Sequence, residues 1–314
     1  HRGDIFKLKK MSFRSSKSWN ESLSWKKYRD YGDYIDDWIV SLWKQISDEQ
    51  QKNQLRFDNT DDLSKLICAV CDRLKQPRDV WYQTLEIYER FMSELYITLN
   101  AHVQSSSCKK EEWRNIICKS QEQTLLRIVS CVQIASKMNC TSRCVTKADA
   151  LSIVNKGPKQ FQMASIGKSE IRVLETLKFK LKAPSLLDFY DITFGAVAMQ
   201  MENLGGVTSN DLKEIYNMGV EYLDSVQFQK SKIYRDFFSE LVGEGVEPSQ
   251  EAKESFEVVI RDHFLMASGV IHASAMTVKP RLADSIEKSL WQTVGIEPND
   301  FAVLSGCIIK TVLE

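Results

Sequence analysis

Two cysteines three residues apart are the first pattern in this sequence that could carry chemistry. Cys68-Ala69-Val70-Cys71 has the CxxC spacing found in thiol-disulfide exchange proteins and in zinc sites. A zinc site needs further ligands, but the sequence has no second CxxC, and no β-α-β pattern surrounds this one. The motif falls inside a predicted helix, so we interpret both cysteines as buried structural residues.

The other reactive residue types form no recognisable catalytic pattern. The 4 histidines have no metal-ligand spacing, and His272 lies in an apolar helical stretch, where a core histidine is expected. Gly243-Glu244-Gly245 lacks the strand and helix that flank a nucleotide-binding loop. Because P-loop, GxSxG and kinase signatures are also missing, we expect a protein that is not an enzyme, with no catalytic residue, cofactor or metal.

The composition is typical of a folded protein from a reducing compartment. Of the 314 residues 43% are hydrophobic, and 42 basic residues balance 42 acidic ones. This balance gives no indication of a nucleic-acid partner, so direct DNA binding is not expected. The 8 cysteines, without a secretory signal, favour the nucleus or cytoplasm. No apolar run reaches the roughly 20 residues of a membrane span.

The beginning of the chain differs from the rest. Residues 1–30 contain nine lysines and arginines against Asp4, Glu21 and Asp30, with many serines between, which predicts a flexible basic arm. The arm could be a solvated tail, or it could serve nuclear import or touch DNA. Residues 31–58 are expected to hold an N-terminal helix, because apolar residues recur there at helical spacing.

From residue 59 onward the apolar spacing predicts one helix after another. The stretch 125–137 is apolar on nearly every side, which indicates a central, buried helix. Thr146 and Asp149 have the spacing of a capping box at the start of the next helix. A further helix is expected over 165–178, with Glu170 at the surface, away from its apolar stripe. Later helices are expected over 185–203, 209–228, 230–242, 252–278, 281–293 and 298–313.

A polar segment, residues 100–122, precedes the central helix and reads as a long, irregular insertion. Such insertions are usually exposed and often carry function. Within it, Trp113, Ile116 and Ile117 could form a short helix with an apolar face, which we interpret as a partner-binding surface. The alternative is that Trp113 folds back onto the helical body.

The two halves of the chain share a short similarity. Val270-Ile271-His272-Ala273-Ser274-Ala275-Met276 aligns with Val132-Gln133-Ile134-Ala135-Ser136-Lys137-Met138. The chain therefore reads as two copies of one helical unit. The copies are unequal, because Ala275 stands where the first copy has Lys137.

Four short motifs in order along the first half resemble the cyclin box. They are Tyr88-Glu89-Arg90-Phe91-Met92, Ile134-Ala135-Ser136-Lys137, Glu170 and Leu177-Lys178-Phe179-Lys180-Leu181-Lys182-Ala183-Pro184. Within the cyclin family, the chain most resembles an atypical cyclin that acts in meiosis, over roughly residues 60–310. The resemblance implies an all-α fold with two five-helix cyclin units in tandem after an N-terminal helix. Residues 59–184 would form the first cyclin box and residues 185–314 a second, degenerate cyclin fold.

The resemblance also implies a site. In kinase-binding cyclins, the lysine and glutamate of these motifs hold the kinase backbone around its αC helix, so that the αC glutamate can pair with the β3 lysine. Here those residues are Lys137 and Glu170. The alternative is an ordinary lysine at a helix end and a glutamate favoured by the dipole near a helix start.

The chain also departs from cell-cycle cyclins. Thr60 stands at the arginine of the first-helix motif and Glu89 at its aspartate partner, so that ion pair is lost. The apolar patch that recruits Arg-x-Leu substrates is in doubt, because Asp61, Asp62 and Lys65 fall there.

The similar atypical cyclin promotes crossover maturation at recombination sites, with a cyclin-dependent kinase and proline-rich partners. The resemblance therefore implies a non-catalytic regulatory subunit on meiotic chromosomes in the nucleus, with meiotic recombination proteins as further partners. One alternative is a cyclin-fold scaffold that does not bind a kinase. Another is a nucleic-acid-binding double cyclin fold of the transcription initiation factor type, but its basic concave face and zinc ribbon are not visible in the sequence.

Overall fold

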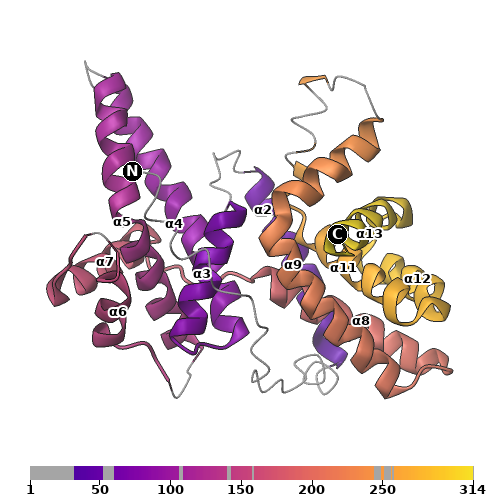
Figure 1. Ribbon diagram of the computed structural model, residues 1–314. Helices are drawn as coiled ribbons and strands as arrows, with labels where there is room; N and C mark the ends of the chain where they lie inside the picture. The colour runs from indigo at the N-terminus through magenta and orange to yellow at the C-terminus, as the bar shows by residue number, and fades with distance from the viewer. Residues whose placement is uncertain are drawn as a thin grey trace. The chain divides into compact units, whose positions relative to one another are not determined.

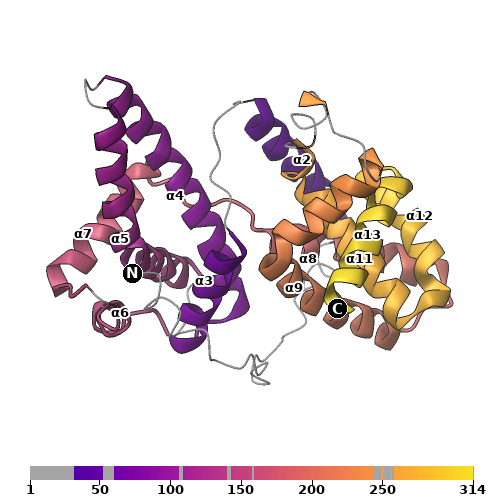
Figure 2. The ribbon, with the colours of Figure 1, turned by 45° about the horizontal axis from the view of Figure 1, so that its top comes forward.

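The computed structural model is built from helices (Figures 1 and 2). It describes residues 32–51, 60–105, 109–139, 143–157, 159–243, 249–250, 256 and 258–313. Within these ranges every regular element is a helix, so the prediction of an all-α protein is confirmed. The predicted basic arm, residues 1–30, lies outside the described residues.

Contacts between residues divide the chain into two units. Unit 1 contains the described residues from 66 to 183, and unit 2 contains residues 32–51, 60–65 and the described residues from 184 to 313. The main boundary between the two units lies between Ala183 and Pro184. Helix α3 (Asp61–Arg73) begins among residues of unit 2 and ends in unit 1.

Unit 1 is organised around helix α5 (Lys109–Met138). This helix packs on α4 (Arg78–Gln104), α6 (Lys147–Val154) and α7 (Met163–Thr176). Every residue from 126 to 136 is buried, as predicted for the central helix. Ser130, Cys131 and Ala135 are fully buried within it, and their small side chains allow neighbouring helices to approach closely.

The predicted irregular insertion is in fact helical, so that prediction is wrong. Helix α4 continues to Gln104 and α5 begins at Lys109, so most of residues 100–122 extends these two helices. Figures 1 and 2 show α4 and α5 side by side as a long hairpin. A polar composition does not prevent helix formation when one apolar side of each helix packs on the other.

The predicted capping box at the start of α6 is confirmed. Asp149 N donates to Thr146 Oγ1 at 3.2 Å, and Thr146 N donates to Asp149 Oδ2 at 3.1 Å. These bonds satisfy backbone N–H groups that have no partner inside the helix. They fix the direction in which α6 leaves the segment that follows α5.

Unit 2 is organised around helix α11 (His263–Val278). It contacts α8 (Leu186–Leu204), α9 (Ser209–Val242), α12 (Ala283–Val294) and α13 (Pro298–Leu313). Every residue from 264 to 275 is buried, which parallels the buried run in α5. Ala275, the counterpart of Lys137 in the internal repeat, is fully buried.

The N-terminal helix, α2 (Ile35–Gln51), belongs to unit 2. It packs on α8, and the Trp43 ring lies 4.9 Å from the Phe264 ring of α11, between centroids. Ile39, Leu42 and Ile46 are buried, so the amphipathic stripe predicted there faces the unit.

One predicted break in unit 2 is confirmed and one predicted helix is wrong. The break expected near residue 229 is present as a kink in α9, where Gln229 has the non-helical angles φ −134° and ψ 22°. The helix expected over 252–278 does not run through residue 262. Helix α11 begins at His263 instead, because Asp262 caps it by accepting from Phe264 N and Leu265 N.

Candidate functional site

Lys137 and Glu170 lie together in unit 1. Lys137 is in the last turn of α5 and its Nζ forms an ion pair with Oε1 of Glu170, in the middle of α7. The side chain of Lys137 is 50% exposed, but that of Glu170 is only 11% exposed. The prediction that Glu170 lies at the surface is therefore wrong, because its position on α7 faces the end of α5.

Close packing of α5 on α7 brings the pair together. Ser169, directly before Glu170 in α7, accepts at its Oγ a 2.8 Å hydrogen bond from Ser130 Oγ, so two small hydroxyl side chains meet between the helices. Ala135, close to Lys137 in α5, is fully buried, as are Ile166 and Val173 of α7. The pair is thus held by a rigid contact between two helices, and the Lys137 ammonium remains accessible to a partner.

Arg90 holds the segment that follows α7. Its guanidinium donates to the carbonyl oxygens of Lys180 and, at 3.5 Å, of Leu181, and its Nε lies 4.0 Å from Glu86 Oε1. The motif that contains Arg90 and the motif that runs from Leu177 to Pro184 are therefore in contact. The sequence analysis found both motifs but did not predict this contact, because it joins residues 90 positions apart.

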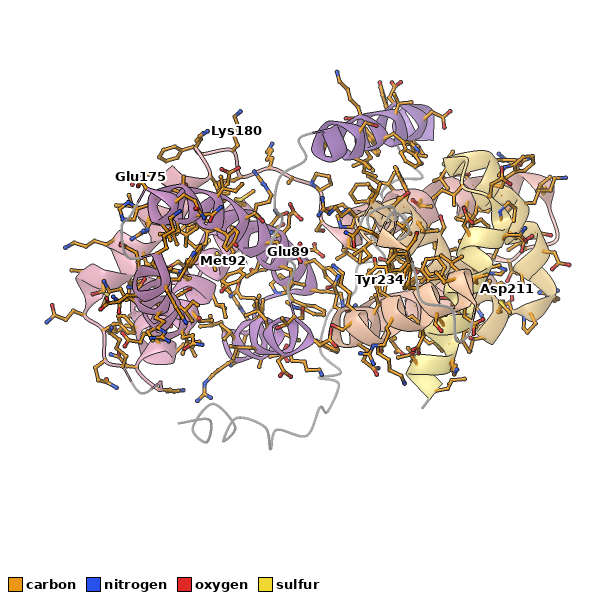
Figure 3. The ribbon with its side chains drawn as sticks, turned by 90° about the horizontal axis from the view of Figure 1, so that it is seen from above. Glu89, Met92, Glu175, Lys180, Asp211 and Tyr234 are labelled. Carbon is orange, nitrogen blue, oxygen red and sulfur yellow. The ribbon has the colours of Figure 1, made fainter. Side chains whose placement is uncertain are left out.

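The segment held by Arg90 has an unusual backbone. Lys178 and Phe179 have φ of 52° and 58°, in the left-handed region, which non-glycine residues rarely adopt. The Phe179 side chain is 67% exposed. Figure 3 labels Glu175 and Lys180, which lie on either side of this turn. Residues held in this region cluster at functional sites, and this strain and the exposed ring were not predicted from the sequence.

Thr60, which differs from the residue of cell-cycle cyclins, has a structural role of its own. Thr60 precedes α3, and its Oγ1 accepts a 3.3 Å hydrogen bond from Leu63 N. The residue that replaces the arginine of cell-cycle cyclins thus acts as a helix N-cap.

The second predicted surface lies on the α4–α5 hairpin. The Trp113 ring stacks on the Tyr96 ring, with centroids 5.6 Å apart and planes inclined by 28°. Trp113 therefore folds back onto α4, as the alternative interpretation expected. Ile117 remains 50% exposed. Trp113, Ile116 and Ile117 line one cavity of about 360 Å³ together with Met92, Leu95, Tyr96, Leu99 and Ser120.

The thiols of the CxxC motif and of the central helix are buried, whereas Cys118 and Cys144 are exposed. Cys68 and Cys71 are buried free cysteines, in agreement with the structural interpretation of the CxxC motif. Burial raises the pKa of the Cys71 thiol well above its usual value, and burial also raises the pKa of Cys131. Because the thiolate is the nucleophile, these pKa directions make both thiols unreactive.

His272 is a core histidine, as predicted. Its side chain is buried, and its Nδ1 lies 3.1 Å from Ser305 Oγ. In the part of the chain that the structure describes, no group of three or more metal-ligating side chains comes together. No described helix is long and apolar enough to cross a membrane.

Comparison with known proteins agrees with the resemblance to cyclins. No family model matches the chain. The human and mouse proteins named Cyclin N-terminal domain-containing protein 1 are each 26% identical to it, over 236 and 237 residues. These matches cover 74% of this chain and 69% of each relative. The predicted resemblance to this atypical cyclin is confirmed, and the chain is cyclin-like.

Proposed function

We propose that this chain is a non-catalytic, cyclin-like regulatory subunit that binds a cyclin-dependent kinase. In this proposal each unit has a cyclin fold: α3 to α7 form the first cyclin box, and α8 to α13 form the second. The similarity to Cyclin N-terminal domain-containing protein 1 and the parallel buried runs in α5 and α11 support this arrangement. The second unit cannot dock a kinase in the same way, because buried Ala275 replaces Lys137.

The ion pair between Lys137 and Glu170 is the observation that carries the proposal. A kinase backbone offers carbonyl oxygens and N–H groups, and this pair offers three ammonium donors and a carboxylate acceptor at one place. Charge-assisted hydrogen bonds to such groups are short and strong. The two side chains neutralise each other in the free chain and are already positioned by the packing of α5 on α7.

We further propose that the chain acts in the nucleus, on meiotic chromosomes, where it promotes crossover designation and maturation with meiotic recombination proteins. The cavity between α4 and α5 would take a proline-rich segment of one such partner. Proline-rich segments dock in grooves lined by aromatic side chains, and Tyr96 and Trp113 line this cavity. The exposed side of Ile117 supports a second contact with the same partner.

Affinity purification from meiotic cells tests the proposal. The tagged wild-type chain should recover a cyclin-dependent kinase and recombination proteins, and it should form foci on meiotic chromosomes. Recovery of recombination proteins without any kinase would instead favour the kinase-independent scaffold. Recovery of the chain on DNA after removal of all partner proteins would favour the nucleic-acid-binding double cyclin fold.

A further inference from the structure

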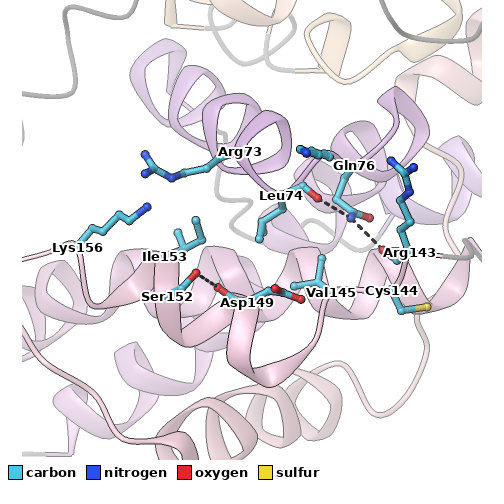
Figure 4. A pocket seen from close by; sticks show the side chains of 11 residues that line it. Arg73, Leu74, Gln76, Arg143, Cys144, Val145, Asp149, Ser152, Ile153 and Lys156 are labelled. Carbon is cyan, nitrogen blue, oxygen red and sulfur yellow. Dashed lines mark hydrogen bonds between the residues drawn. The ribbon is translucent and has the colours of Figure 1, made fainter.

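A polar cavity opens in unit 1, and neither Lys137 nor Glu170 lines it. It has a volume of about 510 Å³, within the range of ligand sites in proteins. Three stretches of the chain line it: the end of α3 with the turn into α4, residues 143–145 after α5, and the outer side of α6. Figure 4 shows the side chains of this cavity, which we call the α3–α6 pocket.

Four basic residues line the α3–α6 pocket: Arg73, Lys75, Arg143 and Lys156. All four are exposed, and within the described ranges none of them has an acidic partner at salt-bridge distance. Figure 4 shows Arg73 and Lys156 at one end of the pocket and Arg143 at the other. Four cations that converge on one cavity from three stretches repel each other unless an anion binds between them.

The acidic side chain in the lining does not neutralise them. Asp149 is engaged in the capping box of α6, where its Oδ2 accepts from Thr146 N at 3.1 Å and from Thr146 Oγ1 at 2.7 Å. Its charge is therefore directed to the first turn of the helix. The described residues that line the α3–α6 pocket still carry a net charge of +3.

The buried side-chain amide of Gln76 links the turn after α3 to the segment after α5, and both of these stretches carry basic residues of the pocket. Gln76 is only 4% exposed, and its Nε2 donates to the carbonyl oxygens of Leu74 and Arg143, each at 3.0 Å. The bond to Arg143 links residues 67 positions apart, so the turn after α3 and the segment after α5 keep a fixed spacing. The dashed lines in Figure 4 mark both bonds. A site whose walls are held in advance loses less conformational freedom when a ligand binds.

Apolar side chains separate the cations. Leu74, Val145 and Ile153 line the same cavity, but no aromatic side chain does. Sites for single-stranded nucleic acid use aromatic platforms along a continuous basic groove, which this isolated cavity lacks. A peptide can instead place a phosphate among the cations and its neighbouring side chains against the three apolar ones.

We propose that the α3–α6 pocket binds a phosphorylated side chain in an extended segment of a partner protein. The phosphate would lie between Arg73 and Lys156, at one end of the pocket. This inference does not depend on kinase docking, because Lys137 and Glu170 do not line the pocket. It would allow the chain to select partners that a kinase has already modified.

Fluorescence anisotropy with the whole chain tests this inference. The probes are short degenerate peptides with a central phosphoserine, phosphothreonine or phosphotyrosine, and the same peptides without phosphate. Arg73→Ala combined with Lys156→Ala removes two pocket cations that are exposed, so folding should be preserved. The matched control is Lys110→Ala with Lys119→Ala, which removes two exposed lysines of α5 in the same unit.

The expected result is saturable binding of at least one phosphorylated library and no binding of its unmodified counterpart. The pocket variant should weaken this binding by about tenfold or more, and the control variant by less than about twofold. The inference is overturned if no phosphorylated library binds, if unmodified peptides bind equally well, or if both variants have the same effect. Competition by inorganic phosphate as strong as by phosphopeptide, or tighter binding of oligothymidylate, would also overturn it.

Discussion

Lys137 and Glu170 form an ion pair whose two members differ in exposure: 50% of the lysine side chain is accessible, against 11% of the glutamate side chain. The lysine can therefore reach a partner by a rotamer change, whereas the carboxylate stays between α5 and α7. Replacing Lys137 and replacing Glu170 should therefore lower the free energy of unfolding by different amounts, because an unpaired charge costs more where water cannot reach it.

Lys137→Ala should destabilise the chain more than Glu170→Gln does. The lysine variant leaves a mostly buried carboxylate without its partner and should lower the free energy of unfolding by about 1 kcal/mol. The glutamine variant leaves a solvated lysine and should cost less than about 0.5 kcal/mol. Urea unfolding measures both values. The exposed pair of Lys159 and Glu122 is the control, and its two single variants should differ little from wild type.

Ala135→Leu should overpack the contacts of α5. Ala135 is fully buried, so three extra carbon atoms have no space and should lower the free energy of unfolding by about 1 to 3 kcal/mol. Ala101→Leu places the same change on an exposed position of α4 and serves as the control. A wild-type melting temperature for Ala135→Leu would show that α5 is not tightly packed.

The stability of the chain should fall as the pH is lowered, in part through His272. Burial lowers the pKa of His272 below its ordinary value of 6.5, despite the nearby carboxylates of Glu287 and Asp284, which raise it. The unfolded chain therefore binds a proton more readily than the folded chain. This contribution to stability is complete above pH 6.5 and is lost as the pH falls through the lower folded pKa.

Unfolding of the His272→Gln variant between pH 5 and 8 tests whether His272 makes the chain less stable at acidic pH. The variant should lose stability less steeply than wild type below about pH 6.5. A steeper loss of stability in His272→Gln would contradict the prediction.

Ile117→Glu should impair binding of the proposed proline-rich partner and leave the fold intact. Ile117 is 50% exposed and lines the α4–α5 cavity, so a carboxylate there reaches water but disrupts an apolar contact. The melting temperature should stay within about 2 °C of wild type. Val40→Glu, at an exposed position of α2, is the control. Equal loss of partner foci in both variants would mean that the cavity is not the docking site.

The central helix could be predicted from the sequence because its pattern is local. A stretch that is apolar on all sides indicates burial whatever surrounds it, and residues 126–136 are buried. The capping box of Thr146 and Asp149 was predictable for the same reason, since both partners lie within one turn.

The hairpin and the burial of Glu170 could not be predicted in the same way. The charged start of α5 is helical because it packs on α4, and Glu170 is buried because α7 places it opposite Lys137. Both depend on contacts between residues far apart in the chain. The α3–α6 pocket was missed for a similar reason, because its cations come from three separate stretches with no shared motif.

Kinase recovery by the double variant Lys137→Ala with Glu170→Ala tests the central claim most directly. Wild type, this variant and the control variant Lys159→Ala with Glu122→Ala are purified from meiotic cells, and the bound cyclin-dependent kinase is quantified. Both variants remove one ion pair from unit 1, so they match in charge and should both fold. We predict that the control variant recovers as much kinase as wild type and that the Lys137 and Glu170 variant recovers none. Equal recovery by all three proteins would contradict the assignment of this pair as the kinase-docking site.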